Sequence, residues 1–219
     1  MTFKEFNLHP DLYQGIEASG YTSPTPVQEL VIPSILSGRD IIASAQTGTG
    51  KTAAFLLPMI HHLIQHKHDH KVSALIIVPT RELAKQISQH IEGFTYFTEI
   101  SFIAIYGGND GQNFVAEKKA LQMGADIVIC TPGRLIAHLN MDYFDLKGLQ
   151  WLVLDEADRM LDMGFQEDLA KITSLLPVSK QTLLFSATMP DRIRQLARKI
   201  LKNPIEVNIN HKKVDKPVD

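Results

Sequence analysis

Short apolar runs alternate with longer amphipathic segments along most of this 219-residue chain, and this alternation restricts the fold more than any other feature. Most runs are followed within two residues by Pro, Gly, Asp or Ser, and then by a stretch with helical periodicity. Strands without a polar face are typical of a parallel sheet that helices cover on both faces. We therefore predict one α/β domain with a mostly parallel sheet. The predicted strands are 40–44, 74–78, 102–106, 126–130, 151–154, 182–185 and, at an edge of the sheet, 205–209.

Two helices are predicted before the first strand. Leu8 and the apolar residues four and eight positions after it share one helical face, and Gly20 is expected to end that helix. Thr25-Pro26 then provides an N-cap followed by proline at the first helical position. Pro33 predicts a break or kink in this second helix.

Composition excludes several classes of protein. The chain is 44% hydrophobic and 21% charged, and it has no apolar run near the roughly 20 residues that span a bilayer. Its first residues have no signal-peptide character, so we expect a cytoplasmic protein that makes no contact with membranes. Because the net charge is −2, binding to nucleic acid would depend on a local patch. We interpret the lysines near the end as a solvated, flexible terminus: Lys199, Lys202, Lys212, Lys213 and Lys216.

Cysteine and histidine supply no strong metal signal. The single cysteine, Cys130, excludes an intramolecular disulfide and is expected to be buried in its apolar run. Five histidines lie between 61 and 70, and His62 and His66 are one helical turn apart, as in a metal site. Only these two share a helical face, so we favour a solvated helix end and predict no metal there.

Residues 45–52 read Ala-Gln-Thr-Gly-Thr-Gly-Lys-Thr and lie between a predicted strand and a predicted helix. Gly48 and Gly50 can take positive φ, which lets backbone N–H groups converge on an anion. Lys51 can reach the terminal phosphates of a nucleotide, and the Thr52 hydroxyl can bind Mg²⁺. Alanine at position 45 departs from the general pattern, and this motif alone leaves an ordinary glycine turn open as the alternative.

Carboxylates that would complement such a loop follow the predicted strand 151–154 in the sequence Asp155-Glu156-Ala157-Asp158. Asp155, at the end of a buried strand, can hold Mg²⁺, and Glu156 can act as a general base on water. Ser186-Ala187-Thr188 follows the next strand, where its hydroxyls can hydrogen-bond these carboxylates. On its own, that tripeptide is more typical of a helix cap.

Taken together and in this order, these motifs resemble the N-terminal RecA-like domain of DEAD-box ATP-dependent RNA helicases. The segment from Gly20 to Gln28 resembles the glutamine motif of that family, which spans residues 1–28 here with Phe6 as its upstream aromatic residue. The resemblance covers about residues 3–210. It implies a P-loop NTPase fold over 1–210, the start of an interdomain linker at 211–219, and the absence of the second RecA-like domain. The segments that carry it are 20–28, 45–52, 79–83, 107–108, 131–134, 155–158 and 186–188.

By this resemblance, the protein binds ATP and Mg²⁺. Tyr21 would stack on adenine and Gln28 would hydrogen-bond its edge, since an amide offers a donor and an acceptor together. Lys51, Asp155 and Glu156 would be catalytic, and Thr52 with Asp155 would hold the metal. Asp158 would connect to Ser186 and Thr188 and couple the nucleotide state to RNA. The remaining nucleotide contacts would come from the loop residues Gln46, Thr47, Gly48, Thr49 and Gly50.

The resemblance also implies contact with the RNA backbone, with little sequence specificity, through loops at strand ends. The stretch 109–120, which we treat as a loop, is longer than in many family members. We expect a monomer that works with a C-terminal RecA-like domain, and weak hydrolysis by this domain alone. A DNA-directed helicase or translocase and a non-catalytic RNA-binding scaffold remain as alternatives. The implied RNA contacts are Pro79, Thr80, Arg81, Gly107, Gly108, Thr131, Pro132, Gly133 and Arg134.

Overall fold

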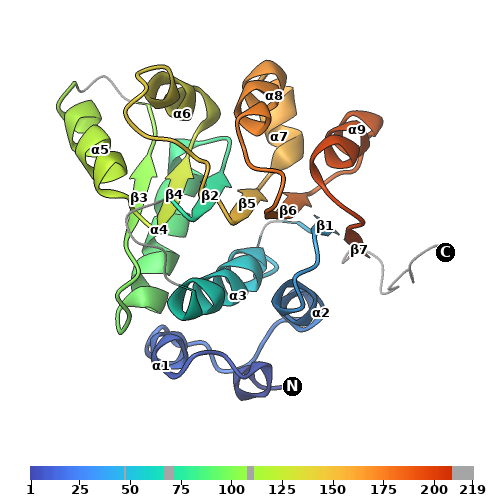
Figure 1. Cartoon of the computed structure of the whole chain (residues 1–219). Helices are drawn as coiled ribbons and strands as arrows, with labels where there is room; N and C mark the ends of the chain where they lie inside the picture. Colours follow the sequence, from blue (N-terminus) through green and yellow to red (C-terminus); the bar gives the residue numbers. More distant parts are fainter. Residues whose placement is uncertain (47, 67–71, 108–110, 209–219) are drawn as a thin grey trace.

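A seven-stranded sheet forms the centre of the molecule, and every pair of neighbouring strands in it is parallel (Figure 1). The structure is a computed structural model that describes residues 1–46, 48–66, 72–107 and 111–208. The strand order is β3-β4-β2-β5-β6-β1-β7, so the last strand lies at an edge, as the sequence predicts. The α/β class and the parallel sheet are confirmed. The strands are β1 (Ile41–Ser44), β2 (Ala74–Ile77), β3 (Phe102–Ile105), β4 (Ile127–Cys130), β5 (Trp151–Leu154), β6 (Gln181–Ser186) and β7 (Ile205–Asn208).

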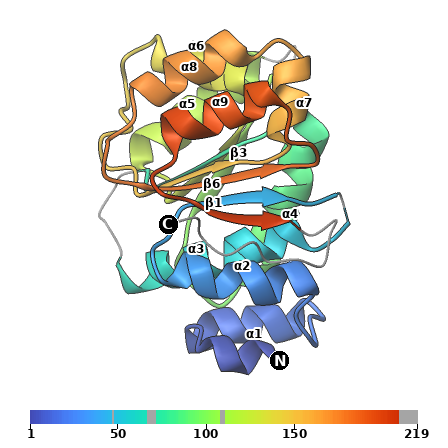
Figure 2. The same cartoon turned by 90° about the vertical axis from the view of Figure 1, so that its right-hand side faces the viewer.

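Helices cover both faces of this sheet (Figure 2). One face carries α2, α3 and α4, with α1 and a turn of 3-10 helix outside them, and the other carries α5 to α9. The elements are the 3-10 turn Phe3–Phe6, α1 (Pro10–Ala18), α2 (Pro26–Leu36), α3 (Lys51–Gln65), α4 (Arg81–Thr95), α5 (Gly111–Met123), α6 (Pro132–Leu139), α7 (Ala157–Asp162), α8 (Gln166–Ser174) and α9 (Asp191–Ile200).

Successive side chains of the strands enter different hydrophobic cores. In β2, Ile76 belongs to the core beneath α2, α3 and α4, whereas Leu75 and Ile77 belong to the core beneath α6 to α9. This follows from the period of two in a strand and explains why most strand positions are apolar, except in the edge strand β7, where Glu206 and Asn208 are exposed. Cys130, in β4, is completely buried in the second core, as expected.

The first two helices follow the prediction in part. Leu8 precedes α1 instead of lying in it, although its side chain is buried. Gly20 ends α1 as predicted: it follows the C-cap residue Ser19 with φ of +79°, and its N–H donates to the Glu17 carbonyl oxygen at 3.0 Å. Thr25 and Pro26 begin α2 as predicted. Of the break or kink predicted at Pro33, the break is wrong, because α2 continues through this residue to Leu36.

Two other expectations about local structure need correction. Lys199 and Lys202 belong to the folded domain: one lies in α9, and the Nζ of the other donates to the Val178 carbonyl oxygen at 2.9 Å. The remaining tail lysines lie outside the described residues. Most of the stretch treated as a loop after Gly108 is helical, since α5 begins at Gly111.

The histidines at the end of α3 make more contacts with other side chains than a solvated helix end would. His62 and His66 stack with ring centroids 4.3 Å apart, and Trp151 Nε1 donates to His62 Nδ1 at 3.4 Å. Only His66 of the two is exposed. Within the described ranges, no three His, Cys, Asp or Glu side chains are grouped as metal ligands. None of the described helices combines the length and apolar character needed to cross a bilayer.

Candidate functional site

The glycine loop connects β1 to α3 as predicted. Gly48 and Gly50 have φ of +80° and +91°, a backbone conformation that residues with a Cβ rarely adopt. Ala45 is completely buried, and its N–H donates to the carbonyl oxygen of Ser186 at 3.1 Å, which ties the loop to the end of β6. The Thr49 hydroxyl donates to the Gln46 carbonyl oxygen at 2.9 Å. Thr47 lies outside the described residues.

Gln28 holds this loop from the N-terminal segment. Its Oε1 accepts from the backbone N–H of Thr25 at 2.9 Å, and its Nε2 donates to the Gly50 carbonyl oxygen at 3.0 Å. The Thr25 hydroxyl donates to the Thr49 carbonyl oxygen at 3.0 Å. A Cβ on Gly50 would lie 2.7 Å from the Gln28 amide nitrogen. The side chain expected to read adenine is therefore buried against the phosphate loop, with one amide N–H and one lone pair beyond these bonds.

Lys51 and Asp155 form a buried pair below the loop. The distance from Lys51 Nζ to Asp155 Oδ1 is 3.7 Å, and the two residues are 6% and 2% exposed. Burial raises the pKa of Asp155 to about 6, although Lys51 and the N–H of Glu156 act in the opposite direction. A divalent cation bound beside Asp155 would favour its charged form, which burial disfavours.

Glu156 occupies an unusual backbone conformation, with φ of +53° and ψ of +48°, at the start of α7. Its N–H donates to Asp155 Oδ1 at 2.9 Å, and its Oε2 lies 3.2 Å from Arg159 Nη1. Left-handed backbone is uncommon outside glycine and often occurs at functional sites. Glu156 thus directly follows Asp155, the acidic member of the buried pair.

Asp158, Ser186 and Thr188 come together, as their motifs imply. Asp158 Oδ2 accepts from the hydroxyl of Thr188 at 2.8 Å and from its N–H at 3.0 Å, and Asp158 N donates to Ser186 Oγ at 3.3 Å. The Ser186 hydroxyl donates to the Thr188 carbonyl oxygen at 2.7 Å. Burial acts to raise the pKa of Asp158, but the hydrogen bonds from Thr188 and Ser186 outweigh it and hold the pKa below its usual value.

Tyr21 lies in a cavity of about 300 Å³ that Thr52 also lines. The Tyr21 hydroxyl is 3.3 Å from His90 Nδ1, and its ring packs edge-on against Phe94, with centroids 5.2 Å apart. Three side chains of α4 that the motifs do not include line this cavity: Gln86, Gln89 and His90. Their spacing of three and four residues puts them on one helical face, and this is the only signal in the sequence that could have indicated them.

The loops expected to contact RNA follow β2, β3 and β4, which are neighbours, so the loops lie at the same end of the sheet. After β2, Pro79 is buried and Thr80 caps α4 by accepting from Leu83 N at 3.3 Å. Arg81 is exposed, and both its guanidinium and the Lys85 ammonium lie over the Tyr106 ring, 5.6 and 5.7 Å from its centroid. Gly107 is exposed, and Gly108 lies outside the described residues.

The loop after β4 is tied to α5. Thr131 is at the N-cap position of α6 but makes no side-chain capping hydrogen bond, Pro132 is buried and Gly133 is exposed. Arg134 Nε donates to Glu117 Oε2 at 2.7 Å, and its guanidinium lies 4.7 Å from the ring centroid of Phe114.

Arg134 is thus paired inside the domain, a contact that its motif does not reveal. Its Nη2 is buried without a hydrogen-bond partner among the described residues. The same Glu117 oxygen is 2.7 Å from Nε2 of the fully buried His138, which also hydrogen-bonds the Tyr143 hydroxyl.

Comparisons with known proteins agree with this geometry. The model of the DEAD/DEAH box helicase family matches residues 25–196. The chain is 45% identical over 208 residues to the DEAD-box ATP-dependent RNA helicase RhpA of Helicobacter pylori, covering 95% of this chain and 41% of the relative. It is 43% identical over 212 residues to the ATP-dependent RNA helicase CshA of Listeria monocytogenes, covering 97% of this chain and 40% of the relative.

The crystal structure of a DEAD box protein from the hyperthermophile Methanococcus jannaschii superposes with a TM-score of 0.88 at 39% identity, covering 95% of this chain and 56% of that one. The chain spans less than half the length of the two curated relatives, RhpA and CshA. Its motifs, its sheet and its similarity over nearly its whole length agree: the chain belongs to the DEAD/DEAH box helicase family and corresponds to the N-terminal RecA-like domain of a DEAD-box RNA helicase.

Proposed function

We propose that this domain binds ATP with Mg²⁺ and the backbone of RNA. With a second RecA-like domain it would couple ATP hydrolysis to local unwinding of RNA duplexes or remodelling of RNA–protein complexes. The observation that carries this proposal is the meeting of three strand ends. The glycine loop follows β1, Asp155 follows β5 and Ser186 is the last residue of β6, and these three strands are neighbours in the sheet. Ligands of open parallel sheets bind at this end.

The nucleotide phosphates would lie against the glycine loop and the N-terminus of α3, where backbone N–H groups and the Lys51 ammonium provide positive charge. Asp155 and the Thr52 hydroxyl are hard oxygen ligands and suit Mg²⁺, which would neutralise the phosphates when bound. The raised pKa of Asp155 supports this assignment, because a buried carboxylate with too little positive charge around it favours a cation.

Glu156 would orient and deprotonate the attacking water. Its left-handed backbone supports this role, since the conformation begins α7 immediately after the metal-binding position. Asp158 would transmit the nucleotide state through Thr188, whose hydroxyl and N–H both donate to it.

RNA would bind along the ends of β2, β3 and β4. Arg81 and Lys85 are held over Tyr106 at this end and can meet phosphates, while the Thr80 and Thr131 loops offer hydroxyl and N–H donors. These groups recognise a backbone, so we expect little dependence on base sequence. Arg134 would contribute less than Arg81, because Glu117 already pairs with it.

Two measurements test this proposal. Fluorescent adenine and guanine nucleotides should be titrated with Mg²⁺ against the 219-residue chain and its Lys51→Ala and Glu156→Gln variants. We expect preference for adenine, loss of binding in Lys51→Ala and retained binding in Glu156→Gln. Equal affinity for both nucleotides, or equal loss in both variants, would refute it.

RNA-stimulated hydrolysis is the second measurement. In this family a second RecA-like domain supplies arginines to the γ-phosphate, and an arginine of this kind is worth about 10³ to 10⁵ in rate. The isolated chain should therefore hydrolyse ATP very slowly and leave duplexes intact. Robust turnover by the chain alone would contradict this expectation, and equal unwinding of DNA and RNA by the full-length protein would favour a DNA-directed enzyme.

A further inference from the structure

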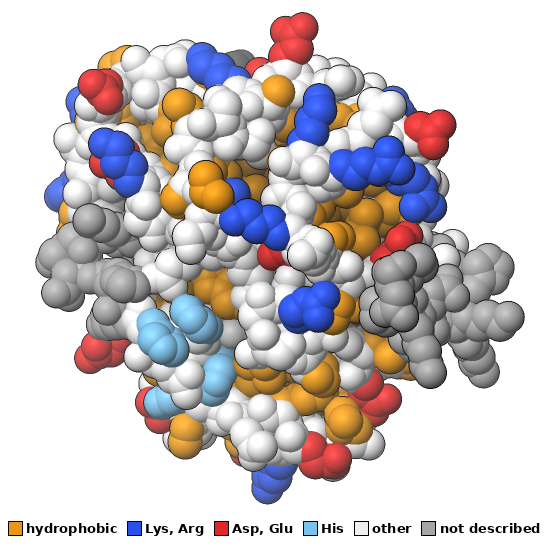
Figure 3. Space-filling view, turned by 45° about the vertical axis from the view of Figure 1, so that its right-hand side comes forward, with side chains coloured by type: hydrophobic (Ala, Val, Ile, Leu, Met, Phe, Trp, Pro, Cys, Tyr) orange, Lys and Arg blue, Asp and Glu red, His pale blue; other side chains and the backbone are white. Residues whose placement is uncertain are grey.

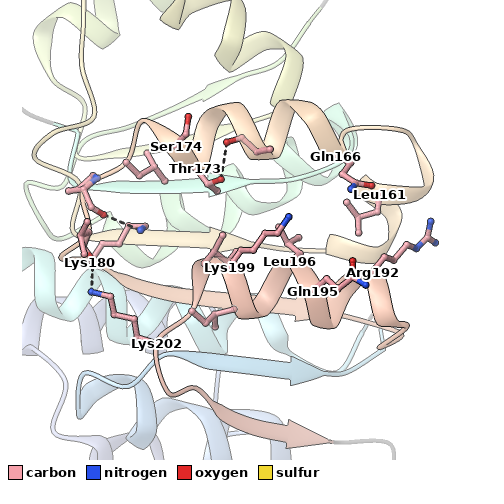
Figure 4. A pocket seen from close by; sticks show the side chains of 16 residues that line it. Leu161, Gln166, Thr173, Ser174, Lys180, Arg192, Gln195, Leu196, Lys199 and Lys202 are labelled. Carbon is pink, nitrogen blue, oxygen red and sulfur yellow. Dashed lines mark hydrogen bonds between the residues drawn. The ribbon is translucent and has the colours of Figure 1, made fainter.

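A groove runs between α8 and α9 on the outer face of the domain and encloses a cavity of about 500 Å³ (Figure 4). This volume lies within the range typical of ligand pockets, about 300 to 1,000 Å³. None of the 16 lining residues belongs to the nucleotide site or to the RNA-binding loops described above. The groove therefore needs an explanation of its own.

The floor of the groove is aliphatic. Leu161, Leu176 and Leu201 line it and are each 8% exposed, and Leu196 and Ile200 of α9, also in the lining, are partly buried. At one end, Val178 is 76% exposed, which is unusual for a side chain beside an apolar cavity. Such a surface gains free energy when another apolar surface covers it.

The charged side chains that line the groove are all positive. The lining contains four cations and no Asp or Glu, although the whole chain has a net charge of −2 (Figure 4). Figure 3 shows Lys and Arg side chains beside hydrophobic surface on one face of the domain. Lys180 and Lys202 lie at one end, where their Nζ atoms donate to the carbonyl oxygens of Pro177 and Val178 at 3.0 and 2.9 Å. Lys199 and Arg192 extend the rim along α9, and Arg192 also pairs with Asp162 outside the lining.

The two lysines at that end are close enough to influence each other. Burial, and then the charge of Lys202, hold the pKa of Lys180 below its ordinary value, while Asp40 acts in the opposite direction. Each ammonium has three N–H donors, and the carbonyl bonds described above use one apiece. An incoming carboxylate would find N–H donors at this end, where two ammonium groups lie near one carboxylate, that of Asp40.

Nucleic acid fits this chemistry poorly. Single strands bind by stacking bases on aromatic side chains, and no Phe, Tyr, Trp or His lines the groove. An amphipathic peptide with apolar residues on one face and carboxylates beside them matches both the aliphatic floor and the cationic rim. We propose that the α8–α9 groove is a docking site for an acidic amphipathic segment of a partner protein.

The test is an unbiased selection of peptides. A library of random 16-residue peptides displayed on phage should be panned on the 219-residue chain, with counter-selection on Val178→Asp. Selected peptides should share aliphatic residues at helical spacing and be rich in Asp and Glu. Their affinity, measured by fluorescence anisotropy, should fall about tenfold in Lys199→Glu at low salt, and by less at high salt, because the effect is electrostatic.

Two matched controls lie next to these positions. Arg198→Glu reverses an exposed charge on the same helix and Leu175→Asp changes an exposed apolar residue before the turn, and neither residue lines the groove. Both should bind the selected peptides like the wild type.

Four results would overturn the proposal. The first two concern the selection: the selected peptides are basic or uncharged, or their enrichment does not depend on Val178. The third is that the control variants bind the selected peptides as weakly as Lys199→Glu does. The fourth is that the chain self-associates and that Lys199→Glu abolishes this self-association. Oligouridine that binds the wild type but not Lys199→Glu would assign the groove to nucleic acid instead.

Discussion

Replacing Gln28 by alanine should destabilise the domain even when no nucleotide is present. The substitution removes two hydrogen bonds, one from Thr25 N–H and one to the Gly50 carbonyl oxygen, each worth about 1 kcal/mol net. It also removes a buried methylene, worth about 0.8 kcal/mol. The expected loss is therefore about 3 kcal/mol, which corresponds to a fall in Tm of about 6 to 12 °C for a domain of this size.

Urea unfolding of the nucleotide-free chain measures this loss directly. Glu29→Gln is the matched control, because Glu29 is the next residue in α2 and its side chain is 41% exposed, with only a 3.6 Å pair to the N-terminal amine. That variant should differ from the wild type by less than about 0.5 kcal/mol. Unchanged stability in Gln28→Ala, together with weaker adenine binding, would show that Gln28 serves the ligand alone and that its contacts with the loop carry no energy.

Two further predictions concern packing and charge. Gly15→Ala should destabilise the chain by about 1 to 3 kcal/mol in urea unfolding, because the new Cβ would lie 2.4 Å from the Phe94 carbonyl oxygen. This loss should appear although alanine favours helices. Gly133→Ala is the control: its new Cβ would meet no described atom within 4 Å beyond its own helix and chain neighbours, so stability should change by less than about 1 kcal/mol. The lowered pKa of Asp158 means that its ionised form stabilises the fold above the unfolded pKa near 3.8 and that this contribution is lost as pH falls through the lower folded value. The stability difference between wild type and Asp158→Asn should accordingly be present at pH 6 and shrink in strong acid, and a difference independent of pH would contradict this reasoning.

The sheet was predictable because its signal is local. Every strand except the edge strand β7 is a short, largely apolar run whose side chains enter both cores, so its sequence shows no polar face. The loop at 45–52 and the acidic strand end were equally visible, since the chemistry of phosphate binding requires particular residues at fixed spacing.

Pro33 shows where such local rules fail. A proline inside a helix costs about 3 kcal/mol, yet α2 continues through it. The flanking residues Val31, Ile32 and Ile35 are all at most 1% exposed, and burying each is worth about 1.5 to 3 kcal/mol. Tertiary packing outweighs the local penalty, and a sequence pattern does not display that balance.

The pairing of Arg134 could not be predicted for a different reason. Its partner, Glu117, lies 17 residues away on another helix. A motif names the arginine but not the carboxylate that the fold places beside it. The cavity residues on α4 escaped prediction in the same way, because only the position of Tyr21 gives them a role.

The left-handed backbone of Glu156 has a consequence for how this domain can evolve. A residue with a Cβ in that conformation costs about 1 to 2 kcal/mol, and glycine would remove the cost. Under the mechanism proposed here, glycine would also remove the carboxylate that activates water. Selection for heat resistance and selection for turnover would therefore oppose each other at this single position, and a stabilised variant found by screening for expression alone should be checked there first.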